Sequence, residues 1–205
     1  MSLIFDNLFV RFPVLEVCKD DILKAFNAVD GCYMNGGKLL CCGNGGSAAD
    51  CDHLVGELMK GFLKHRPLND DEKKNFDSSF VADTLQKGLP AISLCAHSAL
   101  MTAFSNDELP SLVFAQQVYA YAAKNDVLVA FSTSGNSENV VYAAQAAKAA
   151  GIKSIAITGA KESKLSELCE ICIRLPETET YKIQELTLPV YHCLAAMIEE
   201  KYFEI

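Results

Sequence analysis

Two residues whose side chains could bind a metal ion, His53 and Glu57, stand four positions apart in the sequence. In a helix this spacing puts both side chains on one face, where an imidazole and a carboxylate can share one ion. An ordinary pair of polar residues on a helix surface is the alternative interpretation. The pair falls one or two turns into a predicted helix that starts at a glycine-rich loop, and this position favours the metal site.

A second pair, Gln184 and His192, lies near the end of the sequence, with Leu188 midway between them. The spacing of eight residues keeps both on one side of a predicted helix. The neighbours Val190 and Leu194 are apolar, so we expect His192 to be partly buried. From these residues alone, a histidine satisfied within the core is the better-supported interpretation, and a functional one stays open.

Two polar loops each follow a short apolar run that reads as a buried strand. Residues 43–47 are Gly-Asn-Gly-Gly-Ser, and residues 132–137 contain four hydroxyls in six positions. The N-terminus of a helix binds phosphate through its free N–H groups. One residue is enough to cap a helix, so the surplus of hydroxyls favours an anion site over a cap.

The glycine-rich loop at 43–47 lacks the Lys-Ser/Thr of a Walker A motif and the spacing of a dinucleotide-binding motif. We therefore expect no nucleotide cofactor. A tight turn between a strand and a helix is the alternative interpretation of this loop.

These residues sit in a pattern of alternating strands and helices. Helical periodicity runs through the first segment, about 1–36, and a polar insertion with a short helix covers about 65–90. The pattern predicts a doubly wound, mainly parallel, five-stranded α/β sheet flanked by helices. Pro189 predicts a kink or break in the last helix. We expect strands at 39–42, 91–94, 127–131, 153–158 and 171–175, and helices at about 48–64, 98–104, 110–123, 138–150, 164–169 and 180–202.

Composition narrows the functional classes. The net charge of −8 over 205 residues argues against a nucleic-acid surface but not against a phosphorylated ligand. No apolar run approaches the ~20 residues of a membrane span, and no signal-peptide pattern is visible. Nine cysteines, many in apolar stretches, are typical of a reducing compartment, so we expect a cytoplasmic protein with no membrane partner. The pair Cys169 and Cys172 lacks the second pair that a zinc site needs.

Together these motifs resemble the sugar isomerase (SIS) family. The resemblance rests on the loop at 43–47 with His53 and Glu57, the loop at 132–137, and Ile183-Gln184-Glu185 followed by His192. It covers nearly the whole sequence. The loops are shared across SIS domains that bind phosphosugars, whereas the two pairs are more specific to a branch that acts on heptose phosphates.

The resemblance implies one SIS-type, flavodoxin-like domain over 1–205, which would be an aldose–ketose isomerase of sedoheptulose 7-phosphate in nucleotide-activated heptose biosynthesis. It implies that Glu57 and His192 are the acid/base pair, and that the partners are a phosphorylated sugar and further copies in a homotetramer with shared active sites. The implied zinc ligands are His53, Glu57, Gln184 and His192. The implied substrate-binding residues are Asn44, Gly45, Gly46, Ser47, Glu57, Asn106, Asp107, Ser132, Thr133, Ser134, Ser137 and Gln184.

Two departures from the family pattern keep alternatives open. Tyr181 stands where the family often has an aspartate, and the segment at 65–89 is longer than usual. The alternatives are an isomerase of another phosphosugar and a non-catalytic phosphosugar-binding or replication-initiator-binding regulator. The regulator branch lacks the final histidine, so His192 favours catalysis. Loop chemistry alone does not rank heptose against hexose or pentose.

Overall fold

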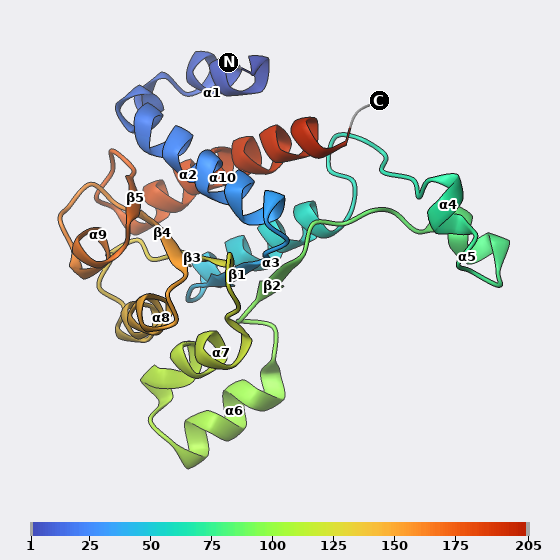
Figure 1. Cartoon of the computed structure of the whole chain (residues 1–205). Helices are drawn as coiled ribbons and strands as arrows, with labels where there is room; N and C mark the ends of the chain where they lie inside the picture. The colour runs from blue at the N-terminus through green and yellow to red at the C-terminus, as the bar shows by residue number, and fades with distance from the viewer. Residues whose placement is uncertain (1, 204–205) are drawn as a thin grey trace.

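Five strands form one sheet in the computed structural model, which describes residues 2–203 (Figure 1). The strand order is β2-β1-β3-β4-β5 and every pairing is parallel. The predicted α/β sheet is confirmed, and it is wholly rather than mainly parallel. The strands are β1 (Leu39–Cys42), β2 (Ala91–Ser93), β3 (Val127–Phe131), β4 (Lys153–Thr158) and β5 (Ile171–Arg174).

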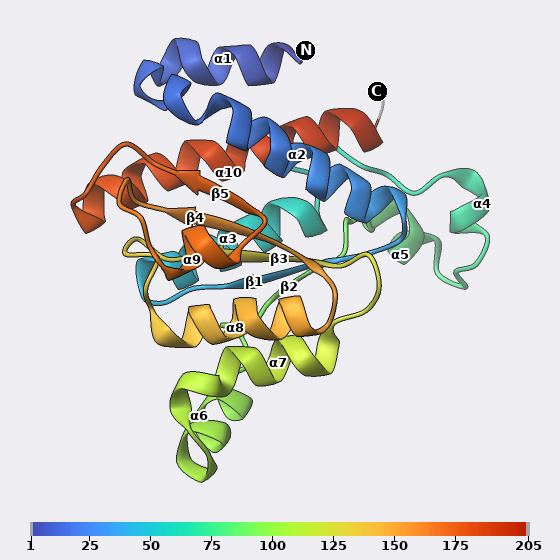
Figure 2. The same cartoon turned by 60° about the vertical axis from the view of Figure 1, so that its left-hand side comes forward.

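Helices cover both faces of this sheet (Figure 2). One face carries α1 (Leu3–Arg11), a 3₁₀ turn (Pro13–Cys18), α2 (Lys19–Met34), α3 (Gly46–Met59) and α10 (Thr180–Tyr202). The other carries α7 (Val113–Tyr121), α8 (Glu138–Ala149) and α9 (Lys164–Leu168). A further helix, α6 (Ser98–Asp107), lies outside α7 and has no buried residue. No helix within residues 2–203 combines the length and apolar content needed to cross a bilayer.

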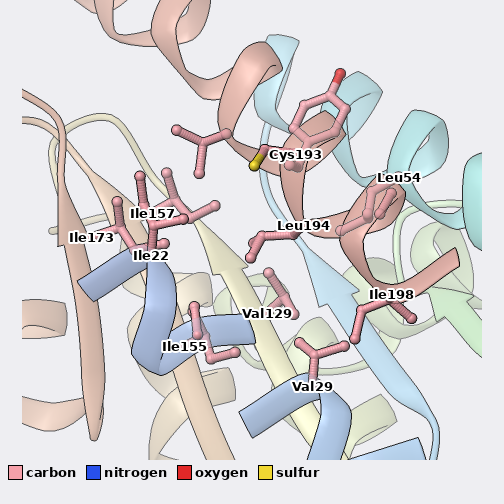
Figure 3. Close-up of a cluster of buried hydrophobic side chains, with 14 of the residues drawn as sticks. Ile22, Val29, Leu54, Val129, Ile155, Ile157, Ile173, Cys193, Leu194 and Ile198 are labelled. Atoms are coloured by element: carbon pink, nitrogen blue, oxygen red, sulfur yellow. The ribbon is translucent and has the colours of Figure 1, made fainter. Parts of the chain in front are cut away.

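The strand β3 shows how the sequence builds these layers. All five of its residues are buried, and side chains alternate between the two faces of a strand. Val129 and Phe131 therefore join the core under α2 and α10, while Leu128 and Ala130 join the core under α7 and α8. Figure 3 shows the first of these cores, where Val129 lies among side chains from α2, α3, α10 and the neighbouring strands.

A kink or break was expected at Pro189, and α10 runs through this residue without a break. Proline removes a hydrogen bond from the helical ladder. Here the helix is held in place by packing, since twelve of its residues are buried, Pro189 among them. The local preference for a break is outweighed by that burial.

The helix α3 ends at Met59, five residues before its predicted end. The helix stops there because the backbone N–H groups of the following residues donate to a side chain instead of to helical carbonyls. Phe62, Leu63 and Lys64 donate their backbone N–H groups to the Glu199 carboxylate at 2.8, 2.7 and 3.1 Å. These groups therefore do not continue the helical ladder.

The polar insertion leaves the body of the molecule as an excursion (Figure 1). It contains two short helices, α4 (Asp70–Lys73) and α5 (Ser79–Thr84), where one was predicted. An isolated antiparallel bridge between Pro67 and Gln86 closes its base. The start of α4 has a capping box between Asn69 and Glu72, which satisfies two helix-end N–H groups without tertiary packing.

Candidate active site

The two polar loops follow β1 and β3, which are neighbours in the sheet. From this pair the chain continues outward in both directions, to β2 on one side and to β4 and β5 on the other. In open α/β sheets, ligands bind outside the carboxyl ends of the strands at such a switch point. The side-chain amides of Asn44 and Asn139 exchange two hydrogen bonds, each 2.9 Å long. They join the glycine-rich loop to the first turn of α8, the helix that follows the serine-rich loop.

The glycine-rich loop holds its shape through two glycines with different roles. Gly45 has φ of +54°, in the left-handed region that glycine tolerates best. Gly46 is the first residue of α3, and a Cβ there would meet the Gln184 amide nitrogen at 2.5 Å. The missing side chain at Gly46 is therefore what lets Gln184 of α10 lie against the loop.

The serine-rich loop leaves the start of α8 free for an anion. Gly135 has φ of +64°, Ser132 donates to the Ser137 hydroxyl at 3.0 Å, and the Asn136 N–H donates to the Ser134 hydroxyl at 3.1 Å. Within residues 2–203, the side chain of the N-cap residue Ser137 makes no capping hydrogen bond to α8. Beside the loop lies a cavity of about 230 Å³ whose lining includes Thr133, Ser134, Asn136, Lys161 and Thr180. Hydroxyls, a lysine and an open helix end suit a phosphate group.

Two helices bring the candidate metal ligands together. His53 and Glu57 lie on α3, and His192 lies on α10. Their ligand atoms are all within 4.8 Å of one another. The His53 Nε2 atom is 3.1 Å from Glu57 Oε1 and 3.5 Å from His192 Nε2. Two imidazoles and one carboxylate are a donor set that zinc accepts, so these residues fit such an ion.

The environment of His192 favours the neutral form of its imidazole. Partial burial, followed by the neighbouring His53, lowers the pKa of the His192 imidazole. The ring of Phe62 packs over it at 5.2 Å between centroids. A neutral imidazole has a lone pair for a metal ion or a proton, so His192 is chemically able to do either. The expectation of a partly buried His192 is confirmed.

Two residues that the sequence reasoning did not single out stand behind His53. The hydroxyl of Tyr191, which is buried, is 2.9 Å from His53 Nδ1. The Oδ2 atom of Asp50 is buried without a hydrogen-bond partner within the described residues. Burial raises the pKa of the Asp50 carboxyl, and burial together with that carboxyl raises the pKa of the Tyr191 phenol. Their positions in the sequence could have pointed to them, because Asp50 precedes His53 by three residues and Tyr191 adjoins His192.

A buried ion pair ties α3 to α10 below this group. Arg66 and Glu199 are each only 1% exposed, and the Arg66 guanidinium donates to Glu199 at 2.8 Å. Arg66 also donates to the backbone oxygens of Leu58 at 2.7 Å and Glu57 at 3.1 Å. These oxygens belong to the last turn of α3, where helical carbonyls have no partner of their own.

Gln184, Asn106 and Asp107, three of the implied site residues, lie away from the group of candidate metal ligands. The Gln184 amide is at Gly46, eight residues and about 12 Å along α10 from His192. Asn106 and Asp107 are exposed at the end of α6, where the Asn106 amide donates to Asp107 at 2.9 Å. The helix was expected to end at about residue 104, but it continues through both residues. Within one chain, the structure brings together three of the four implied zinc ligands.

The chain is similar to known proteins over nearly its full length. A family model described as the SIS domain matches residues 13–159. The phosphoheptose isomerase of Rhodospirillum rubrum is 38% identical over 95% of this chain and 91% of that protein. Phosphoheptose isomerase 2 of Campylobacter jejuni is 37% identical over 97% of this chain and 90% of that protein.

The fold agrees with these matches. The solved structure of a phosphoheptose isomerase from Francisella tularensis superposes with a TM-score of 0.78 and 30% identity, covering 93% of this chain and 91% of that chain. Sequence and fold thus point the same way, and the chain belongs to the SIS domain family, within its phosphoheptose isomerase group.

Proposed function

We propose that this protein is a phosphoheptose isomerase, which interconverts sedoheptulose 7-phosphate and D-glycero-D-manno-heptose 7-phosphate for nucleotide-activated heptose biosynthesis. The observation that carries the proposal is the grouping of His53, Glu57 and His192 within 4.8 Å, on helices that begin near two phosphate-type loops. The named relatives support the same activity. A regulator that only binds phosphosugars has no need of this group.

The loop at 132–137 would bind the phosphate end of the substrate. Ser132, Thr133, Ser134 and Ser137 offer hydroxyl donors, and the open end of α8 offers backbone N–H groups. Asn44, Gly45, Gly46, Ser47 and Gln184 would line the path of the sugar from there towards His192. Holding the phosphate fixes the reacting carbons against the acid/base pair, and such positioning is a large part of catalysis.

The chemistry moves a carbonyl between C2 and C1. Glu57 would take the proton from the carbon next to the carbonyl and return it to the neighbouring carbon, through an enediol. Neutral His192 would carry the second proton from one oxygen to the other. No proton is gained or lost overall. Positioned acid–base groups of this kind contribute roughly 10²–10⁴-fold each.

A zinc ion would be held by His53, Glu57 and His192. Gln184, the fourth ligand that the resemblance implies, lies against Gly46, about 12 Å along α10 from His192 in the same chain. When bound, zinc would supply a Lewis acid that polarises the substrate carbonyl. The two carboxylate oxygens of Glu57 face different partners, since Oε1 is 3.1 Å from His53 and Oε2 is 3.3 Å from the Lys60 ammonium. One oxygen can therefore serve as ligand while the other accepts a proton.

The whole chain would act as one SIS unit, assembled into a homotetramer with shared active sites. Support comes from Asn106 and Asp107, which are exposed on α6 and away from the loops of their own chain. Sugar contacts from these residues would then go to the site of another copy. The cytoplasm is the proposed location, and nine free thiols support it.

A turnover assay with sedoheptulose 7-phosphate, with and without a chelator and added zinc, tests the proposal. Wild-type protein should form the aldose phosphate, and the chelator should remove this activity until zinc restores it. Glu57→Gln and His192→Asn should each abolish turnover and leave the far-UV circular dichroism unchanged.

Matched variants at exposed positions, Glu170→Gln and His65→Asn, should keep full activity. Full activity in Glu57→Gln would disprove the mechanism. A wild-type protein without turnover, whose melting temperature the sugar phosphate still raises, would favour the regulator or another phosphosugar.

A further inference from the structure

The two ring nitrogens of His53 face different environments. Nε2 points into the group of candidate ligands, at 3.1 Å from Glu57 Oε1 and 3.5 Å from His192 Nε2. Nδ1 points the other way, at 2.9 Å from the Tyr191 hydroxyl. The ring of Tyr191 packs edge-on against His53 with 5.5 Å between centroids. The tyrosine is 1% exposed, whereas 45% of the His53 side chain is exposed.

A neutral imidazole carries one proton, and its place decides whether His53 can bind a metal ion. Nε2 can act as a ligand only when its lone pair is free, which requires the proton on Nδ1. Two neighbours pull in opposite directions. The Glu57 carboxylate accepts hydrogen bonds only and favours a proton on Nε2, where it would block the ligand position. The Tyr191 hydroxyl can either accept a hydrogen bond from Nδ1–H or donate its own O–H to a bare Nδ1.

Asp50 decides which of these the tyrosine does. Its carboxylate, when ionised, accepts hydrogen bonds only, and its buried Oδ2 atom has no hydrogen-bond partner among the described residues. It is therefore an acceptor in want of a donor, and after burial the Asp50 carboxyl is the next cause that raises the pKa of the Tyr191 phenol. A hydroxyl that directs its proton towards Asp50 leaves its oxygen lone pairs for the Nδ1–H of His53. The relay then runs in one direction, from His53 through Tyr191 to Asp50.

We infer that Tyr191 and Asp50 are positioning residues that hold His53 as its Nδ1–H tautomer and thereby present a bare Nε2 atom to the metal ion. The inference rests on the proposed metal site and adds residues to it that touch neither metal nor substrate. Histidine ligands of metals commonly donate their second N–H to such an outer partner, and loss of the partner typically lowers metal affinity 10–100-fold.

The first test is zinc affinity, measured by competition with a colorimetric chelator. Tyr191→Phe keeps the buried ring and removes only the hydroxyl, and it should bind zinc about 10–100-fold more weakly than wild type. The matched control is Tyr202→Phe on the same helix, whose hydroxyl donates to the Asp30 backbone oxygen at 3.0 Å. That variant should bind zinc as wild type does. Equal affinities in all three proteins would overturn the inference.

The second test needs no metal and separates this inference from the proposed function. Nitrogen-15 spectra of the histidine rings, recorded on metal-free protein at mildly alkaline pH, distinguish the two tautomers. His53 should carry its proton on Nδ1 in wild type and shift towards Nε2 in both Tyr191→Phe and Asp50→Asn. If wild type binds no zinc but the shift occurs, the metal site fails and the relay stands. If the tautomer is the same in all variants, the relay is wrong.

Discussion

The reacting end of the candidate site and its outer end are built in opposite ways. His53, Glu57 and His192 lie on α3 and α10, which pack on each other and on the sheet. Asn106 and Asp107 lie on α6, a helix without a single buried residue. The first group is positioned by the core of its own chain, while α6 contacts its own chain through partly buried residues such as Met101 and Phe104. We therefore expect one chain to hold the proposed reaction centre and to offer the rest of a site to another copy.

Mixing two inactive proteins is the strongest way to break this comparison. Glu57→Gln damages the reaction centre and Asp107→Ala damages the exposed end, so each alone should lose turnover. If the sites are shared, oligomers co-assembled from both chains should regain activity, because some sites combine an intact Glu57 with an intact Asp107 from another copy. The assay is turnover of sedoheptulose 7-phosphate after co-expression.

The control pairs two changes in the same half of the site. Co-expression of Glu57→Gln with His192→Asn should regain nothing, since both residues of a working centre come from one chain. Equal recovery in both mixtures would contradict the division, as would full activity of Asp107→Ala by itself.

Substitutions near the candidate reaction centre should lower the free energy of unfolding far more than substitutions on α6. Arg66→Met leaves the Glu199 carboxylate, which is 1% exposed, without its cation. We expect a loss of about 3–5 kcal/mol in the free energy of unfolding, because an unpaired buried charge is costly. Asn106→Ala on α6 should stay within about 0.5 kcal/mol. Urea titration measures both.

A surface pair and a rescue variant serve as references for Arg66. Lys24→Met removes an exposed partner of Asp21 and should cost less than about 1 kcal/mol. Arg66→Met combined with Glu199→Gln should recover part of the loss, since no charge is left buried and the amide oxygen still accepts from the N–H groups of residues 62–64. A single Arg66→Met variant as stable as wild type would show that the pair does not hold α3 to α10.

A smaller effect is expected where the glycine-rich loop meets α10. Gly46→Ala puts a Cβ at 2.5 Å from the Gln184 amide nitrogen, so Gln184 must move. Misplacement of this kind should lower kcat/KM by about ten- to a hundredfold, while alanine's better helix propensity preserves stability. Gly56→Ala on the same helix meets nothing within 4 Å and should keep its kinetics. Equal kinetics in both variants would remove Gln184 from the site.

The last predicted effect concerns substrate binding by the loop at 132–137, the proposed phosphate site. Ser134→Ala removes one of several donors to the proposed phosphate, and hydrogen bonds to charged groups contribute about 1.5–3 kcal/mol. KM should therefore rise at least about tenfold with little change in kcat. Ser79→Ala, exposed on α5, is the reference and should match wild type. An unchanged KM for Ser134→Ala would place the phosphate elsewhere.

Local patterns predicted much of this molecule. The strands came from short apolar runs, and β1, β3 and β4 have the predicted bounds. The pairing of His53 with Glu57 followed from helical spacing. Such local patterns do not predict contacts between segments that lie far apart in the sequence. Nothing local shows that Tyr191 faces His53, or that Arg66 needs Glu199, because 138 and 133 positions separate these pairs.

Two further differences have one physical cause. The break expected at Pro189 and the long α3 both came from local rules, and tertiary contacts overrode each of them. Burial along α10 keeps that helix whole, and Glu199 takes the N–H groups that would have extended α3. In both cases the deciding partner lies on α10, far away in the sequence.

The place of α10 in the chain has a consequence for synthesis. It leaves the ribosome after every helix that it packs against, yet it supplies twelve buried residues and His192. Helices α1, α2 and α3 therefore emerge with apolar faces whose partner does not yet exist. Nascent chains with such uncovered surface are prone to aggregate. The core cannot close until α10 has been made, so a product that stops before this helix would lack both a stable core and the proposed reaction centre.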